Sequence, residues 1–203
     1  AKKMAEAFLQ ADYRALPPVL SSAIVDAKDT LARTNDPQLM DFVLDRAFYK
    51  EFLKLTEATG SEFLVGYGRL TADGANLRAA VRAVRMGRDA AFLRQTLVDG
   101  GKVSSHRILA AVTAREPLAP LYAGSPLQKA AQAGDEAIRG GRLTDFEKQC
   151  DNALNAYLSS AKRATFGERP LIYYICAVES EFLAARIVMT GRLSGLPADR
   201  SEE

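Results

Sequence analysis

The residues that most often carry out catalysis are few in this sequence, and their spacing does not suit it. His106 is the single histidine among the 203 residues, so a metal site made of several histidines cannot be built. We expect a surface or helix-capping role for it rather than that of a general base. The glycine pairs lack the spacing of a phosphate-binding loop, and no serine lies in a nucleophile elbow. The sequence therefore predicts no catalytic residue, no metal site and no cofactor.

Two aspartates lie within apolar helical segments and are candidates for a structural role. Asp45 and Asp151 occupy matched positions in two similar stretches of the sequence. Further along the chain, Arg78 and Arg186 are matched in the same way. Because the pKa of a buried carboxylate rises unless it has a partner, we predict the structural ion pairs Asp45–Arg78 and Asp151–Arg186. The alternative is that both aspartates face solvent.

A group of arginines forms a second candidate site. Arg78, Arg82 and Arg85 follow one another at spacings of four and three residues, so they share one face of a helix. One interpretation is a basic strip that faces an acidic partner, either a second protein or a wall of its own domain. The other is a solvated face with local acidic partners.

The composition is that of a globular protein without a strong charge bias. Lysine and arginine total 27 and aspartate and glutamate 25, a net charge of +2. This balance gives no reason to expect nucleic acid or an anionic membrane as a partner. The longest apolar run, residues 171–178, is too short to span a bilayer. Cys150 and Cys176 lack CxxC spacing and are predicted to be buried, reduced thiols in a cytosolic protein, with a disulfide or a reactive thiol as alternatives.

Helical periodicity covers nearly the whole sequence, and strand signals are nearly absent, so the predicted fold class is all-α. We expect helices over residues 1–14 and from Pro17 and Pro18 to 34. A third is expected from Pro37 to 59 behind a cap at Asn35 or Asp36, and a fourth from 62 to 86 behind a cap at Ser61. Further helices are expected at about 89–98, 104–113, 117–122, 126–139, 144–165 and 169–192.

Two internal similarities indicate a repeated helical unit. Residues 100–104 read Gly-Gly-Lys-Val-Ser, and residues 140–144 read Gly-Gly-Arg-Leu-Thr. In each, a glycine would end one helix and the Ser or Thr would cap the next. The stretches 44–48 and 150–154 are also similar. We therefore predict two related helical-bundle domains with antiparallel packing, over residues 36–100 and 101–197, followed by a polar tail at 198–203.

Several of these segments together resemble the C (or d) subunit of V-type and A-type ATP synthases and ATPases. The residues that carry the resemblance are 13–18 (Tyr-Arg-Ala-Leu-Pro-Pro), 77–87, the two glycine pairs, 150–154 (Cys-Asp-Asn-Ala-Leu) and 186–193 (Arg-Ile-Val-Met-Thr-Gly-Arg-Leu). The resemblance extends over essentially the whole chain, and its strength lies in the order of several weak motifs. It implies a funnel of three helical domains, of which this chain is similar to the last two, with residues 1–35 leading in from the first.

The resemblance implies a mechanical function. The subunit would be a non-catalytic rotor connector in the central stalk. It would link the shaft of the catalytic head to the proteolipid ring and transmit torque for ion transport coupled to ATP synthesis or hydrolysis. Arg82 and Arg85 would be possible shaft contacts. The location would be cytoplasmic and peripheral to the membrane. The alternatives are a helical-repeat scaffold for another protein complex and an all-helical enzyme or small-molecule binder.

Overall fold

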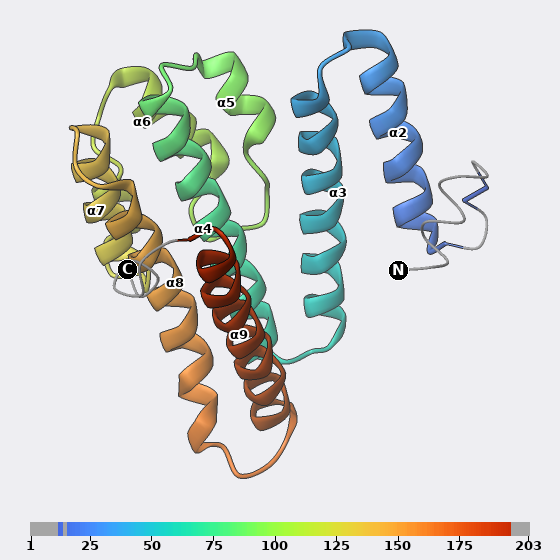
Figure 1. Ribbon diagram of the computed structural model, residues 1–203, viewed down its shortest axis with the longest axis vertical. Helices are drawn as coiled ribbons and strands as arrows, with labels where there is room; N and C mark the ends of the chain where they lie inside the picture. The colour runs from blue at the N-terminus through green and yellow to red at the C-terminus, as the bar shows by residue number, and fades with distance from the viewer. Residues whose placement is uncertain (1–11, 14–15, 196–203) are drawn as a thin grey trace. The chain divides into compact units, whose positions relative to one another are not determined.

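The computed structural model describes residues 12–13 and 16–195, and the regular structure in these ranges is helical throughout (Figure 1). The helices are α2 (Pro18–Thr34), α3 (Pro37–Ala58), α4 (Glu62–Arg85), α5 (Ala90–Thr96), α6 (Ser105–Ala114), α7 (Gln128–Ile138), α8 (Leu143–Ser159) and α9 (Glu168–Leu193), with the 3-10 turns η1 (Ala119–Tyr122) and η2 (Ser160–Arg163). The all-α prediction is confirmed. The helix expected at residues 1–14 lies outside the described residues except for Asp12 and Tyr13, which are not helical, and the tail 198–203 lies wholly outside them.

Helix ends follow the capping residues of the sequence. Asp36 accepts a hydrogen bond from the backbone N–H of Gln38 (2.9 Å) ahead of Pro37, and so starts α3. Ser61 starts α4 in the same manner, because its hydroxyl accepts from the N–H of Leu64 (3.3 Å). These two starts were predicted, and both are confirmed.

Residues 100–104 and 140–144, here called the two glycine joints, differ in how they follow the preceding helix, and neither has the predicted cap. Gly100 and Gly140 have φ values of 98° and 108°, a region that favours glycine. Gly140 follows the end of α7 as expected, whereas α5 already ends at Thr96, four residues before Gly100. Ser104 lies at the N-cap position of α6, but its side chain makes no capping hydrogen bond. Thr144 does not cap α8 either, because α8 already begins at Leu143. The tight turn there is closed by a hydrogen bond from Gly141 N–H to the carbonyl of Glu136 (2.9 Å), and the chain becomes helical before Thr144.

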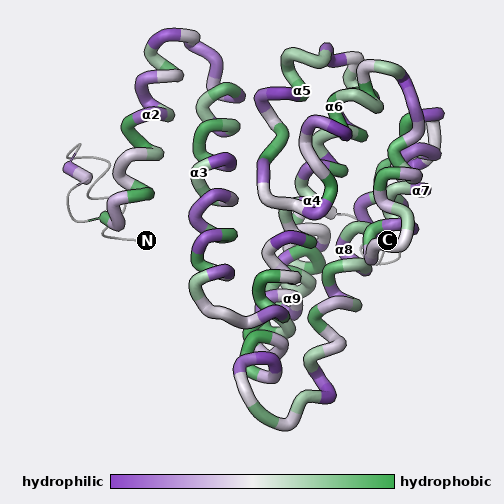
Figure 2. The backbone as a smooth tube through the Cα atoms, turned by 180° about the vertical axis from the view of Figure 1, so that it is seen from behind, coloured by the Kyte–Doolittle hydropathy of each residue, from purple (hydrophilic) through white to green (hydrophobic). Residues whose placement is uncertain are grey.

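Packing divides the chain into two compact units, residues 1–154 and 155–203. In the first, α4 packs against α3, α5, α6 and α7, and its side chains Leu77, Ala80 and Val81 are fully buried. Figure 2 shows apolar and polar residues alternating along α3, whose apolar positions are mostly half-buried and whose buried residue is Thr56. The predicted boundary between residues 100 and 101 falls inside the first unit, and the division into repeated domains stays a prediction.

Gly134 of α7 marks a close approach in the first unit. A Cβ at this position would lie 2.8 Å from a methyl group of Val81 and 3.3 Å from the ring of Phe146. Phe146 and Cys150 on α8 have no exposed surface, and they lie four residues apart on one face of the helix. This face of α8 therefore faces the core of the first unit.

The second unit contains η2 and α9, which contact each other. Gly167, with φ of 91°, precedes α9. Along its length α9 exposes large apolar side chains, including Leu171, Phe182 and Leu193. No helix in the described ranges is long and apolar enough to cross a bilayer.

Candidate functional site

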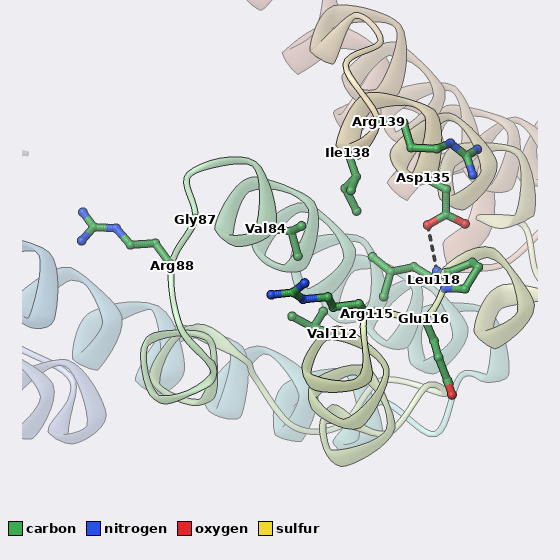
Figure 3. Close-up of a pocket in the computed structure, with 11 residues that line it drawn as sticks. Val84, Gly87, Arg88, Val112, Arg115, Glu116, Leu118, Asp135, Ile138 and Arg139 are labelled. Carbon is green, nitrogen blue, oxygen red and sulfur yellow. Dashed lines mark hydrogen bonds between the residues drawn. The ribbon is translucent and has the colours of Figure 1, made fainter.

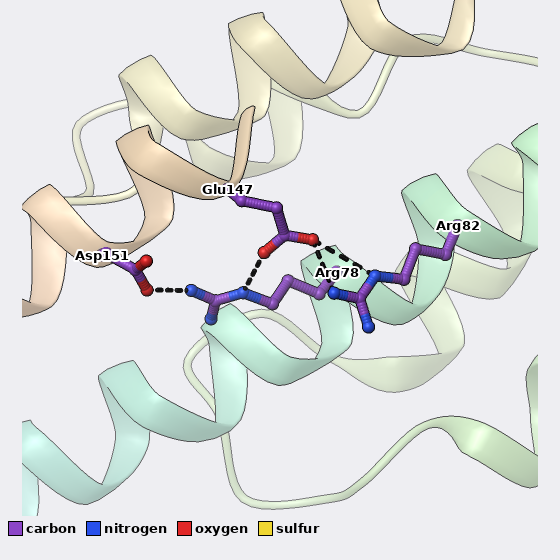
Figure 4. Close-up of polar contacts among 4 residues, drawn as sticks. All are labelled: Arg78, Arg82, Glu147 and Asp151. Atoms are coloured by element: carbon purple, nitrogen blue, oxygen red, sulfur yellow. Dashed lines mark hydrogen bonds and ion pairs between the residues drawn. The ribbon is translucent and has the colours of Figure 1, made fainter. Parts of the chain in front are cut away.

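A cluster of ion pairs joins α4 to α8 within the first unit (Figure 4). The Nε of Arg78 donates to Oε2 of Glu147 at 2.8 Å, and its Nη2 donates to Oδ1 of Asp151 at 2.6 Å. Arg82 contacts Oε1 of the same glutamate through Nη2 (2.7 Å) and Nε (3.1 Å). We call these four residues the α4–α8 clamp.

The clamp depends on a match of helical spacing. Arg78 and Arg82 lie four residues apart on α4, and Glu147 and Asp151 lie four residues apart on α8. Residues at this spacing project from the same face of a helix, so the two cations meet the two anions in register. Glu147 forms ion pairs with both arginines and lies at the centre of the clamp.

Partial burial strengthens the centre of the clamp relative to its edges. The side chains of Arg78 and Glu147 are 21% and 26% exposed, whereas Arg82 is 55% exposed. Burial acts to lower the pKa of Arg78, but the hydrogen bond to Glu147 and nearby negative charges outweigh it, so the pKa is raised overall. Arg78 therefore stays charged, and its ion pair is less screened by water than one on the open surface.

The predicted pairing of Asp45 with Arg78 is wrong. Arg78 takes its carboxylate partners from α8, and Asp45 forms no ion pair with any described residue. Asp45 is exposed, and partial burial and the charge of Asp41 raise its pKa. Asp45 needs no partner because water still solvates it. Arg186 belongs to the second unit, and its pairing with Asp151 stays a prediction.

Arg82 and Arg85 have partners within the chain. Arg82 belongs to the clamp, and Arg85 donates to the carbonyl oxygens of Ala137 (3.3 Å) and Gly141 (2.8 Å) at the end of α7. A basic side chain is favourable there, since the last carbonyls of a helix lack helical partners. These bonds account for the basic strip without a second protein. A shaft contact by Arg82 and Arg85 stays a prediction.

The comparison with known protein families covers the whole chain. A model of the family described as ATP synthase (C/AC39) subunit matches residues 1–203. The chain belongs to this family. The family is that of a stalk subunit of V/A-type ATP synthases, so the resemblance found in the sequence is confirmed. No curated protein and no solved structure matches the chain.

Within residues 12–13 and 16–195, no three His, Cys, Asp or Glu side chains lie together in a way that could hold a metal ion.

The buried carboxylate of Asp73, on α4, is a structural site of the C/AC39 chain that sequence reasoning missed. Its two oxygens accept from the backbone N–H groups of Lys102 (3.0 Å) and Val103 (2.9 Å). Burial raises the pKa of Asp73, and the hydrogen bonds from Val103 and Lys102 act against that rise. Gly101 leaves room for the carboxylate, because a Cβ there would collide with Asp73 Oδ1. Asp73 thus fixes the first glycine joint to α4.

Two further buried polar side chains hold loops in the same way. Asn76 exchanges two hydrogen bonds with the backbone of Val98, both 2.8 Å long. Asp135 on α7 accepts from the N–H groups of Leu118 (2.8 Å) and Ala119 (2.9 Å). The sequence does contain a signal for two of these buried polar residues, because Asp73 and Asn76 interrupt a run of alanine, glycine and leucine on α4. Their partners are backbone groups, which every residue type has, so the sequence does not indicate where these partners lie.

The clamp should couple its members energetically. In a double-mutant cycle with Arg78→Ala and Glu147→Ala, we expect a coupling energy of about 1–2 kcal/mol in urea unfolding. The exposed pair Arg33–Asp29 on α2, at 2.9 Å, is the matched control and should give about 0.3–0.5 kcal/mol. Equal coupling in the two cycles would contradict a special role for the clamp.

Cys150 should be unreactive in the folded protein. It has no exposed surface and forms no disulfide, and burial raises the pKa of its thiol to about 12. Because the thiolate is the nucleophile, a Cys176→Ser variant should resist iodoacetamide at pH 8 and react on unfolding. Since the folded pKa is raised, the contribution of Cys150 to stability is complete below pH 9 and falls as the pH rises toward about 12. Fast alkylation of the native variant at pH 8 would contradict this assignment.

Proposed function

We propose that this chain is the connector between the rotating shaft of the catalytic head and the proteolipid ring of a V/A-type ATP synthase or ATPase. The observation that carries the proposal is the family match over residues 1–203. The proposed role is non-catalytic and peripheral to the membrane on the cytoplasmic side. Torque would pass through the chain between ATP chemistry and ion transport.

A connector that transmits torque must resist deformation, and three features of the first unit support that requirement. The clamp joins α4 to α8, and Asp73 joins α4 to the glycine joint. Asp135 joins α7 to the start of η1. Satisfied polar contacts of this kind have defined geometry, so they restrict sliding between elements more than apolar packing alone does.

The direct test is a pull-down of the full-length protein with the purified shaft and ring subunits. We expect both to be recovered. Recovery of neither would contradict the proposal, and recovery of one would restrict the connector role to that side. An Arg82→Ala, Arg85→Ala double variant tests the predicted shaft contact. It should lose shaft binding while ring binding is unchanged, and an Arg33→Ala variant, altered in an exposed pair on α2, is the control.

A further inference from the structure

A cavity of about 480 Å³ lies where α4, α6 and α7 end in the first unit (Figure 3). Its charged residues have an ordinary explanation. The oxygens of Asp135 accept from the N–H groups of Leu118 and Ala119, and Arg115 and Arg139 are exposed to water. The exposed apolar side of α9, in the second unit, has no such explanation.

The apolar residues on this side of α9 follow a repeat of seven. They are spaced alternately by four and three residues, which is the spacing of the contact seam between paired helices. Phe182 is 73% exposed and Met189 is 64% exposed. We call this set the α9 stripe, and it consists of Leu171, Ile175, Val178, Phe182, Ala185 and Met189.

The opposite side of α9 faces the rest of the second unit. Tyr173, Cys176 and Ser180 line a small cavity together with Leu158 and Ser159. Each residue advances by about 100° around a helix, so these three α9 residues lie on the far side from the stripe. Packing among the described residues of the second unit therefore leaves the stripe uncovered, although an apolar surface of this length usually marks an interface.

Charged residues flank the stripe in a self-complementary order. Glu179 and Arg186 lie seven residues apart, so they share one flank, and they line the same hollow on α9 as Phe182 and Met189. When two identical helices pair antiparallel about a two-fold axis, each contact between two positions occurs twice. Glu179 of each copy would then meet Arg186 of the other.

The register that this ion pairing sets also suits the shapes of the apolar residues. Phe182 would lie against Ala185 of the second copy, and Met189 would lie against Val178. Large side chains therefore meet smaller ones, which allows the two stripes to interdigitate. Glu181, on the other flank, would not meet another acid in this register.

We propose that two copies of this chain associate through the α9 stripe, as an antiparallel pair of helices related by a two-fold axis. Phe182 would lie near the centre of the contact, and two Glu179–Arg186 ion pairs would flank it. The inference goes beyond the connector role, because it requires neither the shaft nor the ring.

Sedimentation velocity of the whole chain over a series of protein concentrations tests the association. We expect a shift from the mass of one chain to that of two as the concentration rises. Phe182→Glu should weaken the dimer at least about tenfold, because it would bury a charge in the contact. Ile187→Glu makes a similar change at a residue that is 53% exposed on the far side of α9, and it should leave the dimer unchanged.

Charge variants test the pairing itself. Glu179→Arg alone and Arg186→Glu alone should each weaken the dimer about tenfold, because like charges would face each other twice. The double variant should return the dissociation constant to within about threefold of the original value. Both residues are exposed, so neither change should alter the helix content measured by circular dichroism.

Three outcomes would overturn the proposal. One is the mass of a single chain at every concentration, which would leave the stripe to a helix of another protein. The others are equal weakening by Ile187→Glu and Phe182→Glu, and no recovery in the double charge variant. Each can occur whether or not the pull-down with the shaft and ring succeeds, so the two proposals can fail separately.

Discussion

Replacing Phe146 with alanine is expected to lower the free energy of unfolding by about 3–5 kcal/mol, measured by urea unfolding. Phe146 has no exposed surface, and its ring lies close to Gly134 and Val81. The first unit cannot close the resulting cavity easily, because Gly134 has no side chain that could move into it. Helix α8, which carries Glu147 of the clamp, would lose a buried apolar contact with the core.

The matched control is Phe166→Ala. Phe166 is 89% exposed, so the same chemical change should alter stability by no more than about 0.5 kcal/mol. A loss below about 1 kcal/mol for Phe146→Ala would show that α8 does not depend on this ring for its attachment, and the packing described for the first unit would be wrong.

Replacing Asp73 with alanine is expected to cost about 2–4 kcal/mol of stability. The change leaves the buried N–H group of Val103 and the partly buried N–H group of Lys102 without their acceptors, and a buried, unsatisfied group costs about 1–3 kcal/mol. Urea unfolding measures the loss. Gly101→Ala should be destabilising as well, because its new methyl group would displace the carboxylate.

The control for this series is Asp26→Ala. Asp26 lies on an exposed position of α2, so its replacement should change stability by no more than about 0.5 kcal/mol. If Asp73→Ala and Asp26→Ala had similar effects, water would be replacing the carboxylate at the glycine joint, and Asp73 would have no structural role.

Local physical chemistry made much of the fold predictable from the sequence. The starts at Asp36 and Ser61 depend on residues within three positions of the cap, and the turn at Gly140 depends on a backbone conformation that glycine adopts readily. Such signals involve neighbours in sequence, so they are visible without knowledge of the tertiary structure. The family assignment likewise used the order of short segments along the chain.

Partner choice across the fold was not predictable in the same way. The sequence predicted that Arg78 pairs with an aspartate. In the structure that aspartate is Asp151 and not Asp45. Matched repeat positions suggested pairing within each repeat, whereas α8 supplies Glu147 and Asp151 to α4. Which helix lies opposite Arg78 is decided by packing of residues such as Phe146 and Gly134, and spacing along one helix carries no information about it.

The segment from Leu97 to Ser104 has no helix of its own, yet the amide hydrogens of Val98, Lys102 and Val103 are bonded to side chains of α4. Their exchange with deuterium oxide should therefore be slow, at rates set by separation of this segment from α4 rather than by motion within the loop. These three amides would be natural probes of how tightly the joint is held when a partner protein loads the subunit.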